Sequence, residues 1–232
     1  MAFRPTFWPT VITIPALIAL IGFGTWQVQR LQWKEALIDK LQTRSTSAPI
    51  PLAKTPSNLN ELEFQQVKVR GRFEHKHEFH LVNRSLNGNP GVHIITPFVR
   101  TDGGGAILIN RGWVPFDKKP VSERPKSQFD EPVTVTGIVR LVKGQGTFTP
   151  DNDAKTNHWF FIDPAAMGAA SGHQFPAGYY LLDGNRQVPG GFPVGHQWTL
   201  NIRNDHLQYA ITWYAMALAL LVIYILYHRK SE

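Results

Sequence analysis

One histidine stands where a polar segment of the chain meets a long apolar run. His206 is followed by Tyr209, Ala210 and Trp213, a spacing that places all four side chains on one face of a helix. A neutral imidazole at a membrane boundary could ligate a metal ion or a haem iron, and Trp213 could stack beside a flat apolar ring. The alternative is an interfacial histidine among aromatic anchors, because ionisable side chains are tolerated at the end of a span. Spacing alone leaves both interpretations open.

A second group of histidines is weaker evidence for a metal site. His75 and His77 would share one face of a strand, as a metal-binding pair does, whereas His80 has the opposite parity. Lys76 stands between the first two, and no Cys or Met completes a soft ligand set. We therefore favour a solvated strand edge over a metal site.

Catalytic patterns are missing from the sequence. The chain has no Cys, which excludes a disulfide framework, a thiolate metal site and a Cys nucleophile. No nucleophile-elbow pattern presents a Ser for attack. The glycines at 103–105 lack the strand, spacing and helix of a phosphate loop and predict a turn. We expect a protein that is not an enzyme.

The charge pattern points to a membrane rather than to nucleic acid. The net charge is +7, but Lys and Arg are scattered along the chain, and only 18% of its residues are charged. A nucleic-acid-binding protein usually gathers its basic residues into a patch or stripe. We expect the lipid bilayer as a partner and no nucleic acid.

Two segments are long and apolar enough to cross a membrane, and His206 stands at the start of the second. Neither Pro5–Gln29 nor Leu207–Tyr227 contains a charged residue, and about 20 apolar residues suffice to cross a bilayer as a helix. The first run is also longer than the apolar core of a cleaved signal peptide. Pro15 lies inside it, where membrane helices tolerate proline.

Two spans put both termini on the same side of the membrane. The positive charges of the tail His228-Arg229-Lys230 and of Arg4 favour a cytoplasmic location for both termini. Arg30, Lys34 and Lys40 flank the other side of the membrane and weaken this difference in positive charge. The pattern divides the chain into residues 1–29 (arm and first transmembrane helix), 30–60 (amphipathic stalk and linker), 61–205 (β-rich exterior domain), 206–228 (second transmembrane helix) and 229–232 (tail).

The exterior domain alternates apolar and polar residues between turn signals, with one short helix expected at Asp163–Gly172. This pattern predicts a mainly antiparallel β barrel or sandwich of α+β type, in which Trp113 serves the core and Arg111 a strand edge. Strands are expected at Phe64–Phe73, Glu78–Arg84, His93–Arg100, Ala106–Val114, Val133–Val142, His158–Asp163, Tyr179–Asp183 and Gln197–Arg203. The Pro-containing segment Ser45–Asn60 predicts an irregular linker.

Several blocks of residues resemble one family almost from end to end. They are Gly24-x-Trp26-Gln27-x-x-Arg30-x-x-Trp33-Lys34, Val69–Phe73, Asn110–Pro115, Pro150–Asp153 leading to Asn157, Trp159 and Asp163, and Asn204-x-His206-x-x-Tyr209-Ala210-x-Thr212-Trp213-Tyr214. The chain thereby resembles the Surfeit locus protein 1 family of cytochrome c oxidase assembly factors. It departs at Ala154, where the family usually has Pro, and at Asp205, where it usually has Asn.

The resemblance implies a multi-pass protein of the inner (cytoplasmic) membrane, with both termini cytoplasmic and the large domain periplasmic. The resemblance to bacterial members further implies binding of haem a and help with its insertion into oxidase subunit I, and the residues implicated match His206, as the iron ligand, and Trp213. Arg30 leaves the first span at the same level and could pair with a propionate, or serve as a snorkelling anchor. The alternative is a haem-free scaffold that holds oxidase subunits or haem A synthase together during assembly.

Overall fold

The computed structural model describes residues 2–3, 5–184, 188–197 and 204–230, and it divides into two compact units. One unit joins the two ends of the chain, Met1–Leu41 and Leu200–Glu232, and the other is Gln42–Thr199. We describe each unit by itself.

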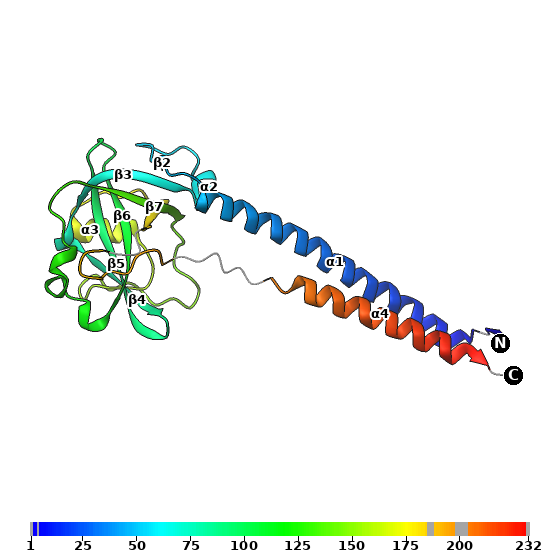
Figure 1. Ribbon diagram of the computed structural model, residues 1–232. Coiled ribbons are helices and arrows are strands. Elements are labelled where there is room, and N and C mark those ends of the chain that lie inside the picture. The colour runs from blue at the N-terminus through cyan, green and yellow to red at the C-terminus, as the bar shows by residue number, and fades with distance from the viewer. Residues whose placement is uncertain (1, 4, 185–187, 198–203, 231–232) are drawn as a thin grey trace. The chain divides into compact units, whose positions relative to one another are not determined.

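The terminal unit is built on two helices, α1 (Phe7–Thr46) and α4 (His206–His228). Short strands β1 (Ala2–Phe3) and β10 (Arg229–Lys230) pair antiparallel beside the two chain ends (Figure 1). Within the described part of the chain these two helices are long and apolar enough to cross a membrane, and only 6% and 11% of their most apolar windows are buried. Many of their large apolar side chains are exposed. Such exposure does not suit the core helices of a soluble protein, and it indicates a membrane protein.

The unit Gln42–Thr199 is a β-rich domain, which confirms the predicted fold class. Its strands are β2 (Ile50–Pro51), β3 (Gln66–Phe73), β4 (Phe79–Leu86), β5 (Asn89–Arg100), β6 (Ala106–Pro115), β7 (Val133–Leu141), β8 (His158–Trp159) and β9 (Tyr179–Asp183). Its helices are α2 (Leu59–Leu62) and α3 (Pro164–Ser171), with 3₁₀ turns η1 (His75–His77), η2 (Phe116–Lys118), η3 (Val121–Glu123) and η4 (Pro125–Ser127).

The long strand β5 closes the sheet into a barrel. The strands are ordered β2-β3-β7-β9-β6-β5-β4-β8, and β3 also pairs with β5. The N-terminal part of β5 pairs with β4, whereas Phe98–Arg100 at its other end pairs with β3. Strands β3, β7, β9, β6 and β5 therefore form a closed ring in which only β6 and β9 run parallel (Figure 1). Closure satisfies the hydrogen-bonding edges of these strands.

The barrel interior is filled by alternate residues of the ring strands. The side chains of Val67, Phe98, Ile109, Val139 and Leu181 are fully buried in one cluster. Trp159 anchors a second cluster, into which Met167 of α3 packs. Helix α3 begins where its sequence predicts, because a carboxylate oxygen of Asp163 accepts the N–H groups of two residues in the first turn.

Several predicted boundaries were wrong. Helix α1 runs on through Thr46, and the segment expected to be an irregular linker contains β2, which pairs with β3. Strand β8 covers only His158–Trp159 of its predicted range. His75 and His77 lie in the turn η1 and not on a strand. The strand predicted at Gln197–Arg203 lies, except for Gln197, outside the described residues.

Candidate functional site

His206, the candidate ligand identified from the sequence, is the first residue of helix α4. His206 follows Asp205, which occupies the N-cap position but makes no capping hydrogen bond with its side chain. The polar residues before it and the uncharged run after it make the helix begin at this point. His206 is half-buried, and the helix holds its ring against α1.

Gln27 of α1 fixes the orientation of this imidazole. His206 Nδ1 lies 2.6 Å from Gln27 Oε1. An amide oxygen only accepts hydrogen bonds, so Nδ1 carries a proton and donates it, and the neutral form of the ring has its lone pair on Nε2. A histidine that binds a metal usually donates its other ring N–H in this way. The arrangement gives His206 the protonation pattern of a metal or haem ligand.

An open pocket of about 560 Å³ surrounds this imidazole. It is lined by Gln27, Lys34, Asp205, His206 and Tyr209. Gln27 and Lys34 are seven residues apart on α1, so they share a face of that helix. The pocket therefore presents an imidazole, a phenol, an amide, an ammonium group and a carboxylate at one level of the helix pair.

The other two predicted site residues make contacts of their own. Trp213 is half-buried, and its ring lies 5.0 Å from that of Phe23, so it packs between the helices and does not line the pocket. The guanidinium of Arg30 lies 4.5 Å from the centre of the Trp33 ring on its own helix, and Arg30 does not line the pocket either. The structure places Lys34 at the pocket, where the sequence had suggested Arg30.

Contacts between side chains hold the two helices antiparallel and so position the site. The hydroxyl groups of Thr25 and Tyr214 are 3.1 Å apart, and those of Thr10 and Tyr224 are 2.7 Å apart. Gly24 makes room for the Tyr214 ring, because a Cβ atom at Gly24 would lie 2.8 Å from Tyr214 Cε1. These contacts recur along α4, and they fix which face of α1 meets His206.

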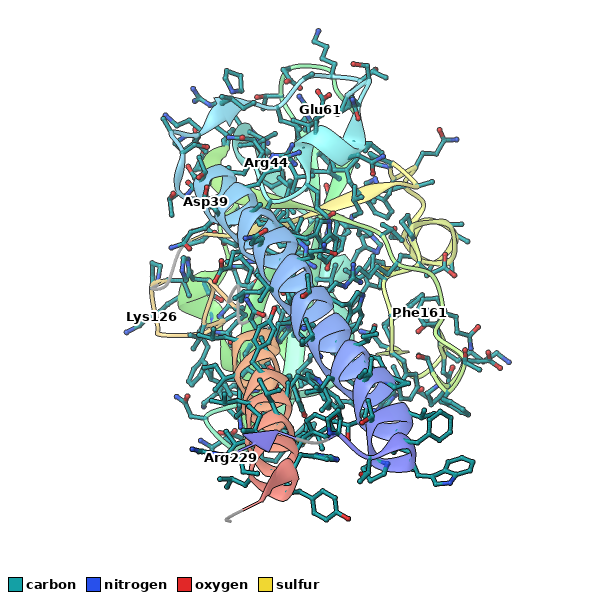
Figure 2. All side chains as sticks on the ribbon, turned by 90° about the vertical axis from the view of Figure 1, so that its right-hand side faces the viewer. Asp39, Arg44, Glu61, Lys126, Phe161 and Arg229 are labelled. Atoms are coloured by element: carbon teal, nitrogen blue, oxygen red, sulfur yellow. The ribbon has the colours of Figure 1, made fainter. Side chains whose placement is uncertain are left out.

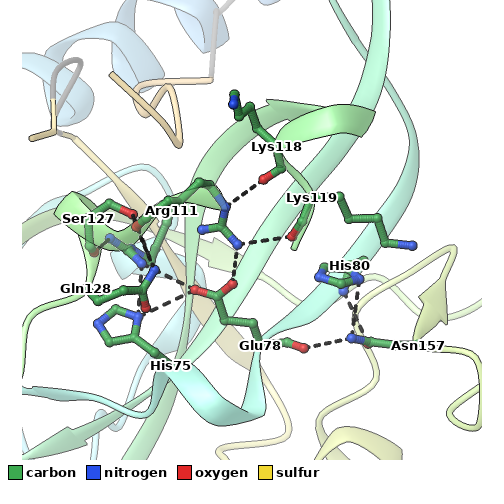
Figure 3. Close-up of polar contacts among 10 residues, drawn as sticks. His75, Glu78, His80, Arg111, Lys118, Lys119, Ser127, Gln128 and Asn157 are labelled. Carbon is green, nitrogen blue, oxygen red and sulfur yellow. Dashed lines mark hydrogen bonds and ion pairs between the residues drawn. The ribbon is translucent and has the colours of Figure 1, made fainter. Parts of the chain in front are cut away.

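A second polar site lies inside the barrel domain, around Glu78 (Figure 3). Its carboxylate receives Arg124 Nη2 at 2.5 Å and Arg111 Nη1 at 3.4 Å, and all three side chains are at most 2% exposed. Arg111 was predicted at a strand edge, and its burial in this cluster corrects that prediction, whereas Trp113 is buried as expected. Backbone carbonyls complete the cluster, since Ser127 O accepts from Arg111 and Lys118 O from Arg124.

Burial and the contacts within this cluster shift the pKa values of Glu78 and Arg111. Burial of the Glu78 carboxyl acts to raise its pKa, but hydrogen bonds from His75 and Arg124 and the charges of the two arginines outweigh burial and lower it. Burial lowers the pKa of Arg111 to about 10, so this arginine remains cationic at neutral pH. His75 Nε2 accepts the Phe129 N–H, which leaves the proton on Nδ1, facing Glu78. The cluster is a buried ionic link that joins the turn just before β4 to β6 and to the loop that follows β6.

The three clustered histidines point to different neighbours. His75 belongs to the Glu78 cluster, His77 lies edge-on to His173, and His80 Nδ1 is 3.3 Å from the Asn157 amide nitrogen. No group of three or more His, Asp or Glu side chains within the described ranges is arranged to hold a metal ion.

Comparison with known proteins shows which family this chain is similar to. The sequence profile of the SURF1 family matches residues 14–218, a range that includes Gln27, Arg30, His206 and Trp213. The chain is 39% identical over 224 residues to Surfeit locus protein 1 of Takifugu rubripes, covering 90% of this chain and 91% of the fish protein. It is 38% identical to Surfeit locus protein 1 of Homo sapiens (87% and 71% covered) and 35% identical to a SURF1-like protein of Monosiga brevicollis (97% and 88%).

Proposed function

The chain belongs to the SURF1 family, and we propose from this membership that it is a cytochrome c oxidase assembly factor of the inner membrane. Its role is binding and delivery rather than catalysis. It receives haem a at the membrane boundary and assists its insertion into oxidase subunit I. The observation that carries the proposal is the hydrogen bond from His206 to Gln27, which leaves Nε2 of a neutral imidazole as a ligand atom.

The residues of the pocket fit haem a as a cargo. Haem a supplies an iron that accepts an imidazole nitrogen, two propionates and an isoprenoid tail that prefers lipid. His206 offers the imidazole, and Lys34 offers a cation for a propionate in the same pocket. The exposed apolar faces of α1 and α4 suit the tail. Trp213 would act through its packing against Phe23, as a positioning residue.

A haem-free scaffold is the second candidate function. Trp213, which the resemblance assigns to haem, contacts Phe23 instead of the pocket, and Arg30, which its position suggested for a propionate, contacts Trp33. Their contacts favour a structural role for this part of the helices. In that case the protein would hold oxidase subunits or haem A synthase together through its exterior domain.

The absorbance of the purified full chain distinguishes the two functions. Protein taken from cells that make haem a should be coloured if it binds the haem, and His206→Ala should lose that colour at unchanged abundance. His228→Ala is the matched control on α4, because both ring nitrogens of His228 are engaged, with Thr6 and with the Tyr224 carbonyl. A colourless wild-type protein that still co-purifies with oxidase subunits would favour the scaffold.

The proposed orientation places both termini in the cytoplasm and the barrel in the periplasm. The basic tail beyond His228 supports it, since short cytoplasmic flanks carry an excess of positive charge. A reporter active only in the cytoplasm should be active when fused after Glu232, and a periplasmic reporter should be active when inserted near Ser57. Reversed activities would contradict the orientation.

A further inference from the structure

A small pocket on the barrel domain gathers cations beside aromatic rings. It measures about 190 Å³, and its lining includes Arg84 of β4, Arg140 of β7, Lys143, Phe160, Phe161 and Tyr180. Phe161 lies on the outer side of this domain in Figure 2. The pocket shares no lining residue with the one around His206, and it stands independently of the proposed haem function.

A β-bulge turns Arg84 into this pocket. In the pairing of β4 with β5, Leu81 faces His93 and Arg84 faces Gly91, so three steps along β4 match two along β5. Asn83, inside the bulge, has a φ of 56°, a conformation that non-glycine residues rarely adopt. In a regular strand, residues three apart point to opposite faces, but here Leu81 and Arg84 line the same pocket. Bulges that re-aim a side chain in this way recur beside functional sites.

In the part of the chain that the structure describes, few acidic side chains or hydrogen bonds offset the positive charges that line this pocket. Arg84 donates one hydrogen bond to a described residue, from Nη1 to the carbonyl of neighbouring Asn83, and forms no ion pair with the described part of the chain. Arg140 Nε is buried without a hydrogen-bond partner and lies 4.0 Å from Glu63, the one acid paired with these cations among the described residues. Lys143 is exposed at the rim. The pocket therefore carries an excess of positive charge.

Tyr180 adds a neutral donor to the pocket lined by the two arginines. Burial raises the pKa of its phenol, while the charges of Arg140 and Arg84 act on it in the opposite direction. The phenol thus stays protonated at neutral pH, and both guanidinium groups lie near enough to influence it. A hydroxyl and two guanidinium groups together suit the oxygens of a phosphate or carboxylate.

The aromatic wall is held in place before any ligand arrives. Asn152 Oδ1 accepts the N–H groups of Phe160, at 2.8 Å, and Phe161, at 3.4 Å, and Asn152 Nδ2 donates to the Phe161 carbonyl. These bonds fix the backbone that carries both rings. A preorganised wall lowers the entropy cost of binding an apolar group against it.

We propose that this pocket binds the anionic group of an amphiphilic ligand. A phosphate or carboxylate would lie between Arg84, Arg140 and the Tyr180 hydroxyl, and the apolar part of the ligand would lie against Phe160 and Phe161. The volume accommodates one such group and a few carbon atoms, so the rest of the ligand extends outside. Both a lipid headgroup and a soluble amphiphilic anion have this chemistry.

Calorimetric titration of the full chain in a neutral detergent tests the proposal. Phenyl phosphate should bind saturably and more tightly than inorganic phosphate, and benzyl alcohol should not bind. Arg84→Gln and Lys143→Gln should each weaken phenyl phosphate binding about tenfold, because each removes a positive charge that attracts the anion to the pocket. Lys143 is exposed, so its replacement leaves the core intact.

The control is Arg72→Gln, an exposed arginine on β3 outside the pocket, which should leave the affinity unchanged. Competition by nanodiscs that contain phosphatidylglycerol, but not by discs of phosphatidylcholine alone, would identify a lipid headgroup as the source. Competition by neither would identify a soluble anion. Absence of saturable phenyl phosphate binding, or equal affinities in the pocket variants and the control, would overturn the proposal.

Discussion

Replacing Glu78 by Gln should destabilise the barrel domain strongly. The change keeps the shape of the side chain but removes the only negative charge that the structure places against both Arg111 and Arg124 among the described residues. Both guanidinium groups are buried, with 1% of each side chain exposed, so water cannot replace the lost charge. One nitrogen on each, Arg111 Nε and Arg124 Nη1, already lacks a hydrogen-bond partner.

The size of the effect follows from the burial. Removing one partner of a buried ion pair costs about 3–5 kcal/mol, a large share of the roughly 5–15 kcal/mol by which a domain is stable. For a domain of this size about 1 kcal/mol corresponds to 2–4 °C, so the melting temperature should fall by roughly 6–20 °C. Near-ultraviolet circular dichroism, to which the buried Trp113 and Trp159 contribute, would follow the barrel as the full chain is heated in detergent.

Glu123→Gln is the matched control. Glu123 lies 3.5 Å from Lys118, and the two side chains are 51% and 37% exposed. Exposed pairs contribute about 0–1 kcal/mol, so the control should melt within about 4 °C of the wild type. If Glu78→Gln melted as close to the wild type as Glu123→Gln does, the buried cluster would not stabilise the barrel and the reasoning would be refuted.

Three further predictions concern the helix pair and the pH dependence of the barrel. Gln27→Leu removes the acceptor for the His206 N–H and should weaken haem a binding about 10- to 100-fold in a titration. Gly24→Ala adds a Cβ against the Tyr214 ring and should destabilise the helix pair by about 1–3 kcal/mol, seen as earlier loss of helical circular dichroism on heating. Burial and then Arg84 lower the pKa of His93 to about 4, so the unfolded chain takes up protons from about pH 6.5 downward that the folded state does not. Stability to urea should fall from pH 7 to pH 5, and His93→Gln should reduce that fall.

A specific result would contradict each of these three predictions. Gln29→Leu, on an exposed position of α1, should leave haem binding unchanged, and equal losses in both Gln variants would remove the special role of Gln27. Gly22→Ala meets nothing within 4 Å and should melt like the wild type, so equal effects at both glycines would contradict the packing argument. An unchanged urea midpoint between pH 7 and pH 5 would show that His93 is protonated in the folded barrel.

Elements defined by local signals were predictable from the sequence. The start of α3 follows from Asp163 and Pro164, because a cap and a proline in the first turn act within a few residues. Strand β9 at Tyr179–Asp183 matches its apolar pattern at both ends. The two apolar helices were predictable because length and hydropathy are themselves sequence properties.

Features that depend on distant partners were not predictable. The barrel closes because β5 pairs with β6 along one edge and its last residues pair with β3 along the other, beyond β4. No pattern within the sequence of β5 indicates that its second edge is shared by two strands. The bulge at Asn83 interrupts the alternation of residues along β4, and its position depends on how β4 pairs with β5, which the sequence of β4 does not reveal.

The candidate site shows the same limit. His206 could be chosen from its own surroundings, but Gln27 is 179 residues away, and its block of sequence does not say which side chain faces the histidine. Lys34 rather than Arg30 at the pocket follows from how the two helices face each other, a tertiary property.

Chemical rescue of His206→Gly by imidazole tests the haem proposal most directly. The variant removes the ring but leaves Gln27 to receive a free imidazole in the same place. The purified variant should lack the haem a spectrum, and millimolar imidazole should restore the spectrum together with the haem content. His228→Gly should keep the spectrum without imidazole. Full haem content in His206→Gly, or a spectrum lost and not restored by imidazole, would show that this histidine is not the iron ligand.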